Sequence, residues 1–211
     1  FNLSDIQHFC VLVIGNLGDC GVVSLESISQ FRNPRICVMA DAPGFAFIRD
    51  TLASIRKMNI LCEHEIPSDL FWVLEGTESS FEYSKFGNEK FFRLMFLKWR
   101  IIQEAISERD YGDQVIFTDL DVIWKYYRRI EFESGDENSP VCAIQKDFSK
   151  SGRVFFCPGI MIWQKSVSGE DKLKEVEAFH KSLIEKEGTI PDDKALNRWL
   201  RIANNMIYFK G

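Results

Sequence analysis

Two aspartates, Asp119 and Asp121, are separated by one residue and follow the apolar strand-like segment Gln114–Thr118. If the chain is extended there, both side chains point the same way. The apolar flanks partly withdraw them from water, so the two like charges repel each other and lose hydration. A divalent cation relieves both penalties, and oxygen ligands suit Mg²⁺ or Mn²⁺. The pair therefore predicts a metal site with positions open to diphosphate oxygens; the alternative is two exposed acids in a turn.

A second candidate is Lys98, which interrupts the apolar stripe of a helix expected over Phe91–Glu108. A cation on the inward face of a helix needs a carboxylate or a ligand phosphate as its partner. The alternative is a lysine that extends past the edge of the core to solvent. The stripe, at spacings of four and three, consists of Phe91, Met95, Lys98, Ile102 and Ala105.

A third candidate is the acidic pair Asp192 and Asp193, which opens a helix after Pro191. Acids at this place often serve as an N-cap or lie in the first turn. We expect that structural role for at least one of the two, which leaves the other acid and Asn197 available for a substrate. The N-terminus of a helix would also help to hold an anionic group.

The elements that must position these residues alternate between strands and helices. Such alternation predicts an α/β fold with a mostly parallel sheet and helices on both faces. Ligands bind such sheets at the carboxyl ends of the strands, which puts Asn16, Asp41 and the Asp119/Asp121 pair on one edge. The expected strands are Phe9–Ile14, Arg35–Ala40, Ile60–Glu65, Gln114–Thr118 and Val141–Ile144, and Val154–Gln164 is either a bent strand or a turn between two short strands. The expected helices are Val22–Phe31, Pro43–Met58, Phe91–Glu108, Gly169–Lys186 and Asp192–Ile202, with a long loop over Pro67–Lys90.

The length, net charge and cysteine pattern of the chain argue against several classes of protein. The 211 residues suit one domain, and the net charge of -5 gives no footprint for nucleic acid or anionic membrane. The longest apolar runs fall far short of a membrane span. The six cysteines are scattered without a CxxC pair, which argues against zinc and against a dense disulfide scaffold and favours buried free thiols.

The run from Lys98 through Asp119-Leu120-Asp121 to Trp124 resembles the GT-A fold nucleotide-diphospho-sugar transferases, whose pattern is a helix lysine followed by a DxDxxW motif. Three other segments are similar to later or earlier elements of that family. They are Phe156–Met161, with Gly159 and with Cys157 in place of an asparagine; Asp192–Asn197, with Asp193 where a glutamine is usual; and Val38–Asp41, whose acid usually lies near the nucleotide base or ribose.

The resemblance implies a single GT-A-like domain over 1–211, whole or cut at either end. It implies a glycosyltransferase, hexosyl or pentosyl, that takes a nucleotide-sugar donor (a UDP-sugar foremost), uses Mn²⁺ or Mg²⁺ and retains the anomeric configuration. The acceptor could be a glycan, a protein or a small molecule. The implied site has Asp192 and Asp193 as catalytic residues, Asn16, Asp41, Lys98, Asp119 and Gly159 for donor binding, and Asp119 and Asp121 for the metal.

Departures from the family keep alternatives open. The family often has a third metal ligand, a histidine near the C-terminus. His8, His64 and His180 lie elsewhere in this sequence. Either the domain is truncated, or a water fills the position of that ligand. A haloacid dehalogenase-like phosphatase also uses DxD after a strand, although its motif normally opens the sheet. A non-catalytic nucleotide-sugar-binding domain is a further alternative. A nucleotidyltransferase stays open as well, although no Gly-rich phosphate loop with a following lysine is found near the N-terminus. The expected compartment is the ER or Golgi lumen for a eukaryotic chain and the cytoplasm for a bacterial one.

Overall fold

The computed structural model contains one seven-stranded sheet in the order β3-β2-β1-β4-β6-β5-β7. All neighbouring strands are parallel except β6, which runs antiparallel to β4 and β5. The strands are β1 (His8–Val13), β2 (Arg35–Ala40), β3 (Asn59–Glu65), β4 (Gln114–Thr118), β5 (Cys142–Phe148), β6 (Val154–Gln164) and β7 (Ile207–Lys210). The structure describes residues 7–31, 33–55, 59–65, 89–125, 132, 141–148, 152, 154–188, 190–202 and 207–210.

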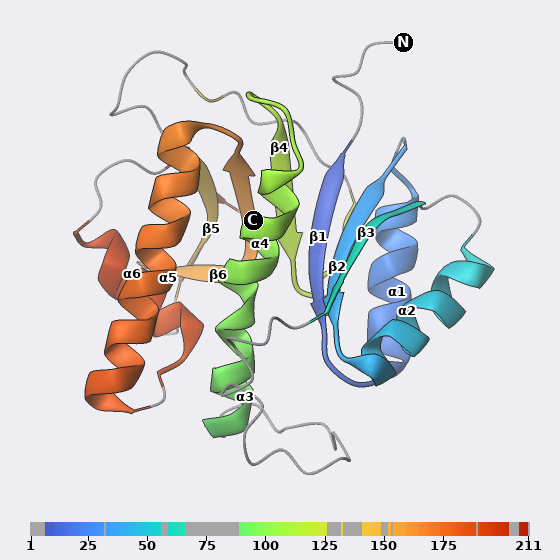
Figure 1. Ribbon diagram of the computed structural model, residues 1–211, viewed down its shortest axis with the longest axis horizontal. Coiled ribbons are helices and arrows are strands. Elements are labelled where there is room, and N and C mark those ends of the chain that lie inside the picture. The colour runs from blue at the N-terminus through green and yellow to red at the C-terminus, as the bar shows by residue number, and fades with distance from the viewer. Residues whose placement is uncertain are drawn as a thin grey trace.

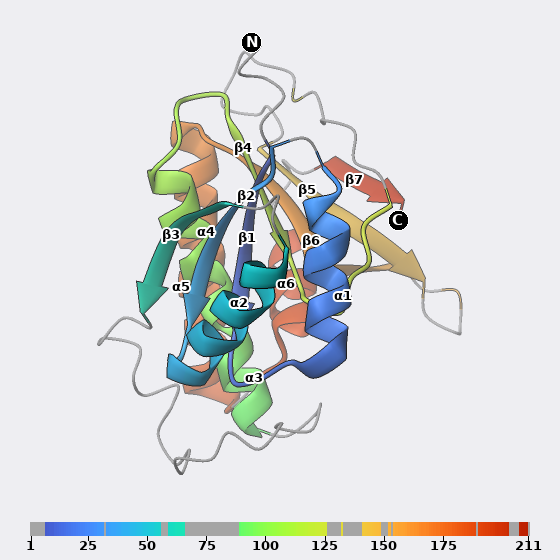
Figure 2. The same ribbon diagram turned by 90° about the vertical axis from the view of Figure 1, so that its right-hand side faces the viewer.

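Helices cover both faces of this sheet, as the sequence predicts (Figure 1, Figure 2). Helices α1 and α2 lie on one face and α4 and α5 on the other. Successive side chains of a strand point to opposite faces, so Phe9 and Val11 of β1 join the core under α1 and α2, whereas Cys10 joins the core under α4 and α5. The helices are α1 (Gly18–Ser29), α2 (Ala42–Ser54), α3 (Glu89–Met95), α4 (Leu97–Ser107), α5 (Val167–Glu187) and α6 (Asp192–Leu200).

The helix expected over Phe91–Glu108 is two consecutive helices, α3 and α4. The backbone changes to three-residue hydrogen bonds at the junction, where Phe96 N donates to Arg93 O at 3.1 Å and Trp99 N donates to Phe96 O at 3.3 Å. Strand β5 runs beyond the expected Val141–Ile144, and β7 has no counterpart in the sequence prediction. The long loop expected over Pro67–Lys90 lies outside the described residues except for its last two, which belong to α3.

The bend predicted in β6 is a bulge. In the pairing of β5 with β6, Ile144 lies opposite Met161 and the next residue, Gln145, lies opposite Cys157. Pro158, Gly159 and Ile160 therefore have no partner on β5. Proline has no N–H to donate to a neighbouring strand, and the bulge directs this part of β6 toward the end of β4.

The expectation of free thiols is right for Cys10 and Cys142, which are buried and unbonded, and whose thiol pKa values are raised by burial. It is wrong for Cys37, which is disulfide-bonded. The parallel register of β2 and β3 places the Cα of Cys37 opposite that of Cys62. Within the described parts of the chain, no helix is both long and apolar enough to cross a membrane.

Candidate functional site

The candidate residues follow the parallel strands β1, β2 and β4, whose carboxyl ends face the lower edge of the sheet in Figure 1. Asn16 follows β1, Asp41 follows β2 and Asp119 follows β4. The bulge of β6 also reaches this edge, because the amide of Asp119 donates to the carbonyl of Gly159 at 2.9 Å. The structure thus gathers these four donor-binding candidates at one edge, as the strand order requires.

The centre of the site is Lys98, whose side chain is only 4% exposed. Its Nζ lies 3.0 Å from Asp119 Oδ2 and 2.8 Å from Asp192 Oδ2. The same nitrogen lies 5.5 Å from the ring centre of Phe117. Lys98 therefore faces inward, as its place on the apolar stripe predicts, and joins the DxD segment to the start of α6.

The charges of this cluster do not cancel. Burial by itself lowers the pKa of Lys98, but Asp119 and Asp192 outweigh it, so the net pKa is raised and the ammonium stays charged. Burial raises the pKa of Asp119, and the nearby Asp192 and Asp121 raise it further, against the lowering effect of Lys98. One cation shared among three carboxylates leaves an excess of two negative charges, which a divalent cation would neutralise.

The DxD segment is a turn, so the expectation of an extended chain there is wrong. The carbonyl of Asp119 accepts from the amide of Val122 at 3.3 Å. Two serines of α1 fix the turn, since Ser24 Oγ donates to Val122 O at 2.7 Å and Ser27 Oγ accepts from Trp124 N at 2.9 Å. As a result the two acids differ: the Asp119 side chain is 33% exposed, whereas Asp121 lies at the surface.

Trp124 anchors the end of this turn. Its Nε1 donates to Thr118 Oγ1 at 3.1 Å, across the DxD segment. Its ring packs edge-on against Phe9 at 5.5 Å and against Phe31 at 6.1 Å between centres. The motif tryptophan thus holds the two aspartates by packing and by one hydrogen bond, a role that the sequence pattern alone does not reveal.

Gly159 lies directly beside Asp119. A Cβ at Gly159 would lie 3.1 Å from Asp119 Oδ2 and 3.4 Å from Cys157 Sγ, so a larger residue would crowd the carboxylate. Cys157 itself is half-buried, and burial raises the pKa of its thiol. The absence of a side chain at Gly159 therefore lets the backbone of β6 come close to the Asp119 carboxylate.

The two acids at the start of α6 differ in their surroundings. The N-cap position is Pro191, without a side-chain cap, so both acids lie in the first turn. Asp192 is buried against Lys98, and Asp193 is more exposed and forms no ion pair within the described residues.

Asn197 is not available for a substrate, contrary to expectation. Its Oδ1 accepts from Phe156 N at 2.9 Å, and its Nδ2 donates to Phe156 O at 2.8 Å and to Asp193 O at 2.7 Å. All of its polar atoms are therefore used to clamp β6 to α6.

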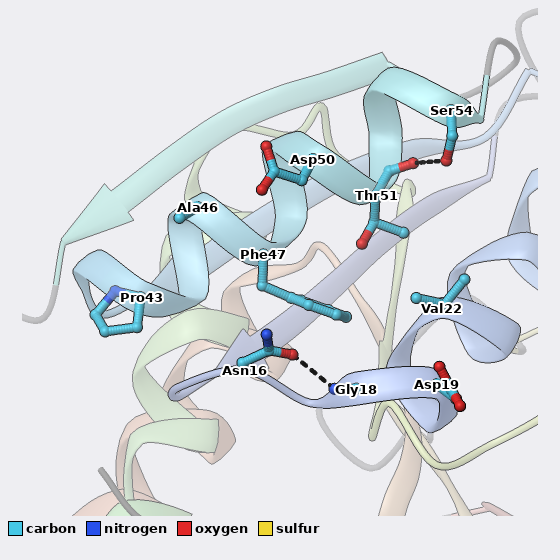
Figure 3. Close-up of a pocket in the computed structure, with 10 residues that line it drawn as sticks. All are labelled: Asn16, Gly18, Asp19, Val22, Pro43, Ala46, Phe47, Asp50, Thr51 and Ser54. Atoms are coloured by element: carbon cyan, nitrogen blue, oxygen red, sulfur yellow. Dashed lines mark hydrogen bonds between the residues drawn. The ribbon is translucent and has the colours of Figure 1, made fainter. Parts of the chain in front are cut away.

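Asp41 has a structural role that the sequence prediction did not include. Its Oδ1 accepts from Gly44 N at 2.8 Å, which caps α2, and from Gly15 N at 2.9 Å, which fixes the turn after β1. Its Oδ2 is buried and has no hydrogen-bond partner in the described part of the chain. Asn16 is exposed, and its Oδ1 accepts from Gly18 N at 2.8 Å (Figure 3).

No histidine joins this site. His180 is buried in the core, where its Nδ1 accepts from Trp99 Nε1 at 2.9 Å and its Nε2 lies 3.0 Å from Ile190 O. His8 Nδ1 lies 3.0 Å from Arg109 Nη1. His64 Nε2 lies 3.9 Å from Oε1 of Glu108, which directly follows α4.

A metal would find only part of its ligands in this protein. Among the residues that the structure describes, no group of three or more His, Cys, Asp or Glu side chains is arranged to hold one. Asp119 and Asp121 both belong to the DxD turn and supply carboxylate oxygens to a cluster with an excess of negative charge. This donor set fits Mg²⁺ or Mn²⁺ when water and a diphosphate complete the shell.

The fold and the arrangement of its strand ends define a class, the GT-A-like fold of nucleotide-sugar transferases, which nucleotidyltransferases share. No protein-family model and no curated protein sequence matches the chain. Because the sequence identities to the solved structures are low, the similarity shows the fold alone. The chemistry has to be argued from the residues of the site.

Three solved structures illustrate the likeness. The apo form of mouse xyloside xylosyltransferase 1 has a TM-score of 0.59 and 12% identity, covering 98% of this chain and 85% of that chain. Core-mannan synthase A from Aspergillus fumigatus, in a Mn/GDP form, has a TM-score of 0.57 and 9% identity, covering 97% and 72%. The inositol-1-phosphate CTP transferase from T. maritima has a TM-score of 0.51 and 9% identity, covering 98% and 86%.

Proposed function

We propose that this chain is a metal-dependent glycosyltransferase domain that moves a sugar from a nucleoside-diphosphate donor to an acceptor. The observation that carries the proposal is the buried ammonium of Lys98, which bridges Asp119 of the DxD turn and Asp192 of α6 at the carboxyl edge of the sheet. A buried cation with two acids is costly to desolvate. Its position at the edge where such sheets bind ligands favours a functional role over a purely structural one.

Asp119 and Asp121 would hold Mn²⁺ or Mg²⁺. The excess of negative charge around Lys98 supports this assignment. A bound divalent cation would neutralise the diphosphate oxygens and stabilise the departing group. The turn that carries the two acids is anchored to α1, so their positions are set before the donor arrives.

The nucleoside part of the donor would lie toward Asn16 and Asp41. The buried, unpartnered Oδ2 of Asp41 supports this, because a buried acceptor without a donor is costly unless a ligand supplies one. A UDP-sugar is the first donor to test.

The sugar part would lie between Gly159 and the start of α6. Asp192 is committed to Lys98, so we assign to it the placement of the ammonium near the diphosphate. Asp193, which has no ion pair in the described residues, is the acid free to approach the anomeric carbon and to stabilise positive charge as the diphosphate leaves. We propose transfer with retention on the resemblance to the family.

We propose an oxidising compartment on the basis of the cysteine chemistry. Disulfides persist mainly in oxidising compartments, and Cys37 is disulfide-bonded. This supports an ER or Golgi lumenal location over the cytoplasm.

A nucleotidyltransferase is the second candidate, because the CTP transferase of T. maritima shares the fold. The two functions differ in the bond that breaks: a glycosyltransferase releases a nucleoside diphosphate, and a nucleotidyltransferase releases pyrophosphate. The phosphatase alternative gains no support, since the DxD segment follows β4 in the middle of a GT-A-like sheet. A non-catalytic binding domain would bind the donor without turnover.

The first experiment is titration of UDP and Mn²⁺, together and separately, into the wild type and into Asp121→Asn. We expect binding that needs both partners and that falls at least tenfold in the variant. The matched control is Asp147→Asn, which removes an exposed carboxylate from β5. Equal affinity in Asp121→Asn and wild type would overturn the metal assignment. A nucleotide-sugar panel followed by phosphorus NMR then identifies the released product and separates the candidate activities.

A further inference from the structure

His180 is a buried titratable residue of α5 that the proposed function does not use. Helix α5 packs against both α4 and α6 (Figure 1). The centre of the His180 ring lies 5.3 Å from that of Phe96 and 6.3 Å from that of Trp99. One ring nitrogen contacts α4, and the other contacts the segment before α6. The histidine therefore lies between the helix that carries Lys98 and the helix that carries Asp192.

The two contacts of His180 fix the position of its proton. An indole N–H can only donate, so Nδ1 of His180 accepts from Trp99 Nε1 at 2.9 Å. The proton of the neutral ring is then on Nε2, which donates to the carbonyl of Ile190 at 3.0 Å. Burial lowers the pKa of His180, against the raising effects of the Ile190 carbonyl and of Asp192. The ring is therefore neutral near pH 7, and one tautomer satisfies both contacts.

The bond to Ile190 holds the peptide from which α6 starts. Pro191 follows, and its ring restricts its φ, here −56°, so the orientation of the Ile190 carbonyl is passed on to the next residue. The carbonyl of Pro191 accepts from Ala195 N at 3.0 Å, which is the first hydrogen bond of the helix. Asp192 is the first residue of α6, and its Oδ2 lies 2.8 Å from Lys98 Nζ. A short and restricted piece of backbone thus separates the contact of His180 from the buried ion pair.

We propose that His180 is a positioning residue of the candidate donor site, and that its Nε2–H bond to Ile190 sets the first turn of α6 so that Asp192 meets Lys98. Ile190 is only 6% exposed, so its carbonyl would be left without a partner if the bond were lost. That cost favours rotation of the peptide toward another donor, and the rotation would displace Asp192. Only the effect on donor binding rests on the proposed function; the effect on the ion pair does not.

Two variants separate the two bonds of His180. In His180→Gln the amide nitrogen can take the place of Nε2 and donate to Ile190, whereas the bond to Trp99 is lost. In His180→Asn the amide oxygen can take the place of Nδ1 and accept from Trp99, whereas the bond to Ile190 is lost. Denaturant titration should show a loss of stability in both, because each leaves a buried polar group unpaired. The control for loss of stability alone is Leu173→Ala, which creates a cavity two helical turns earlier in α5.

Titration calorimetry of UDP with Mn²⁺ measures donor binding, and proton–nitrogen NMR of the Lys98 ammonium measures the ion pair. We expect an affinity within about threefold of wild type in His180→Gln and Leu173→Ala, and a loss of about tenfold or more in His180→Asn, because a displaced group weakens a preorganised site. The ammonium signal is assigned by its absence in Lys98→Met. Burial and ion pairing slow the exchange of its protons with water, so wild type should show the signal. It should be lost in His180→Asn and retained in His180→Gln and Leu173→Ala.

The proposal is overturned if His180→Asn binds the donor as tightly as wild type or retains the ammonium signal. It is also overturned if His180→Gln loses as much as His180→Asn, since packing of the imidazole would then explain both results. A test without any variant is long-range proton–nitrogen NMR of wild type, in which a proton on Nδ1 of His180 would refute the proposed bond. If wild type does not bind UDP with Mn²⁺, the proposed function fails, and the ammonium signals of the variants still decide the role of His180.

Discussion

The ammonium of Lys98 and the carboxylate of Asp192 lie 2.8 Å apart, and this contact joins α4 to the first turn of α6 beneath the DxD turn. Both groups are almost fully buried, and the ammonium of Lys98 keeps its charge because Asp119 and Asp192 lie beside it. The contact also explains why the two neighbouring acids of α6 have different surroundings. The predictions below use these differences.

Lys98→Met should both destabilise the fold and abolish donor binding. Removing the cation leaves two carboxylates without their partner, at a cost of about 3 kcal/mol in the free energy of unfolding. The matched control is Lys165→Met, since Lys165 is also buried and pairs with Glu170 at 2.7 Å, away from the site. Denaturant titration should show a loss in both variants, whereas UDP and Mn²⁺ binding should disappear only in Lys98→Met. Normal binding in that variant would remove Lys98 from the donor site.

Asp192→Asn and Asp193→Asn should have distinguishable effects. Asp192→Asn weakens the hold on Lys98, so it should lower donor affinity and stability together. Asp193→Asn should leave stability and donor affinity close to wild type but lower the rate of donor hydrolysis by a factor of about 100 or more, because electrostatic groups at a reacting centre contribute on this scale. Calorimetry and proton NMR of the product anomer measure both outcomes. An inverted product would reject retention, and near-normal turnover in both variants would exclude both acids.

Gly159→Ala should weaken the binding of Mn²⁺ with UDP about tenfold, since crowding of a packed site typically costs about 1–3 kcal/mol. The added methyl group would lie 3.1 Å from Asp119 Oδ2 and would push the carboxylate out of position. Circular dichroism should show a retained fold. Unchanged affinity would mean that binding of metal and donor does not depend on the position of the Asp119 carboxylate.

His8 should make stability depend on pH. Burial and the nearby Arg109 lower the pKa of His8 from 6.5 to about 4. Below pH 6.5 the unfolded chain takes up a proton that the folded chain does not, so stability is lost as the pH falls from 6.5 toward 4, by at most about 3 kcal/mol. Urea unfolding at pH 7 and pH 5 should show a smaller loss for His8→Gln than for wild type. An equal loss in both proteins would contradict this assignment.

The sequence was sufficient for the fold class because the buried parallel strands read as continuous apolar runs and the inward stripe of α4 made Lys98 stand out. It could not reveal what depends on contacts between distant segments. The hydrogen bonds of Asn197 to Phe156, the capping of α2 by Asp41 and the serines of α1 that hold the DxD turn each join residues whose separation along the chain carries no periodic signal. The disulfide at Cys37 was missed for the same reason, because nothing in the spacing of the cysteines along the chain marks that residue.

The clamp between Asn197 and Phe156 has a mechanical consequence. Two hydrogen bonds fasten α6 to β6 just before the bulge, and the bulge carbonyl at Gly159 in turn accepts from the amide of Asp119. A continuous series of hydrogen bonds therefore links α6, the bulge and the DxD turn. A displacement of α6 would shift the backbone at Asp119, so the acids at the start of α6 and the acids of the DxD turn would keep their spacing.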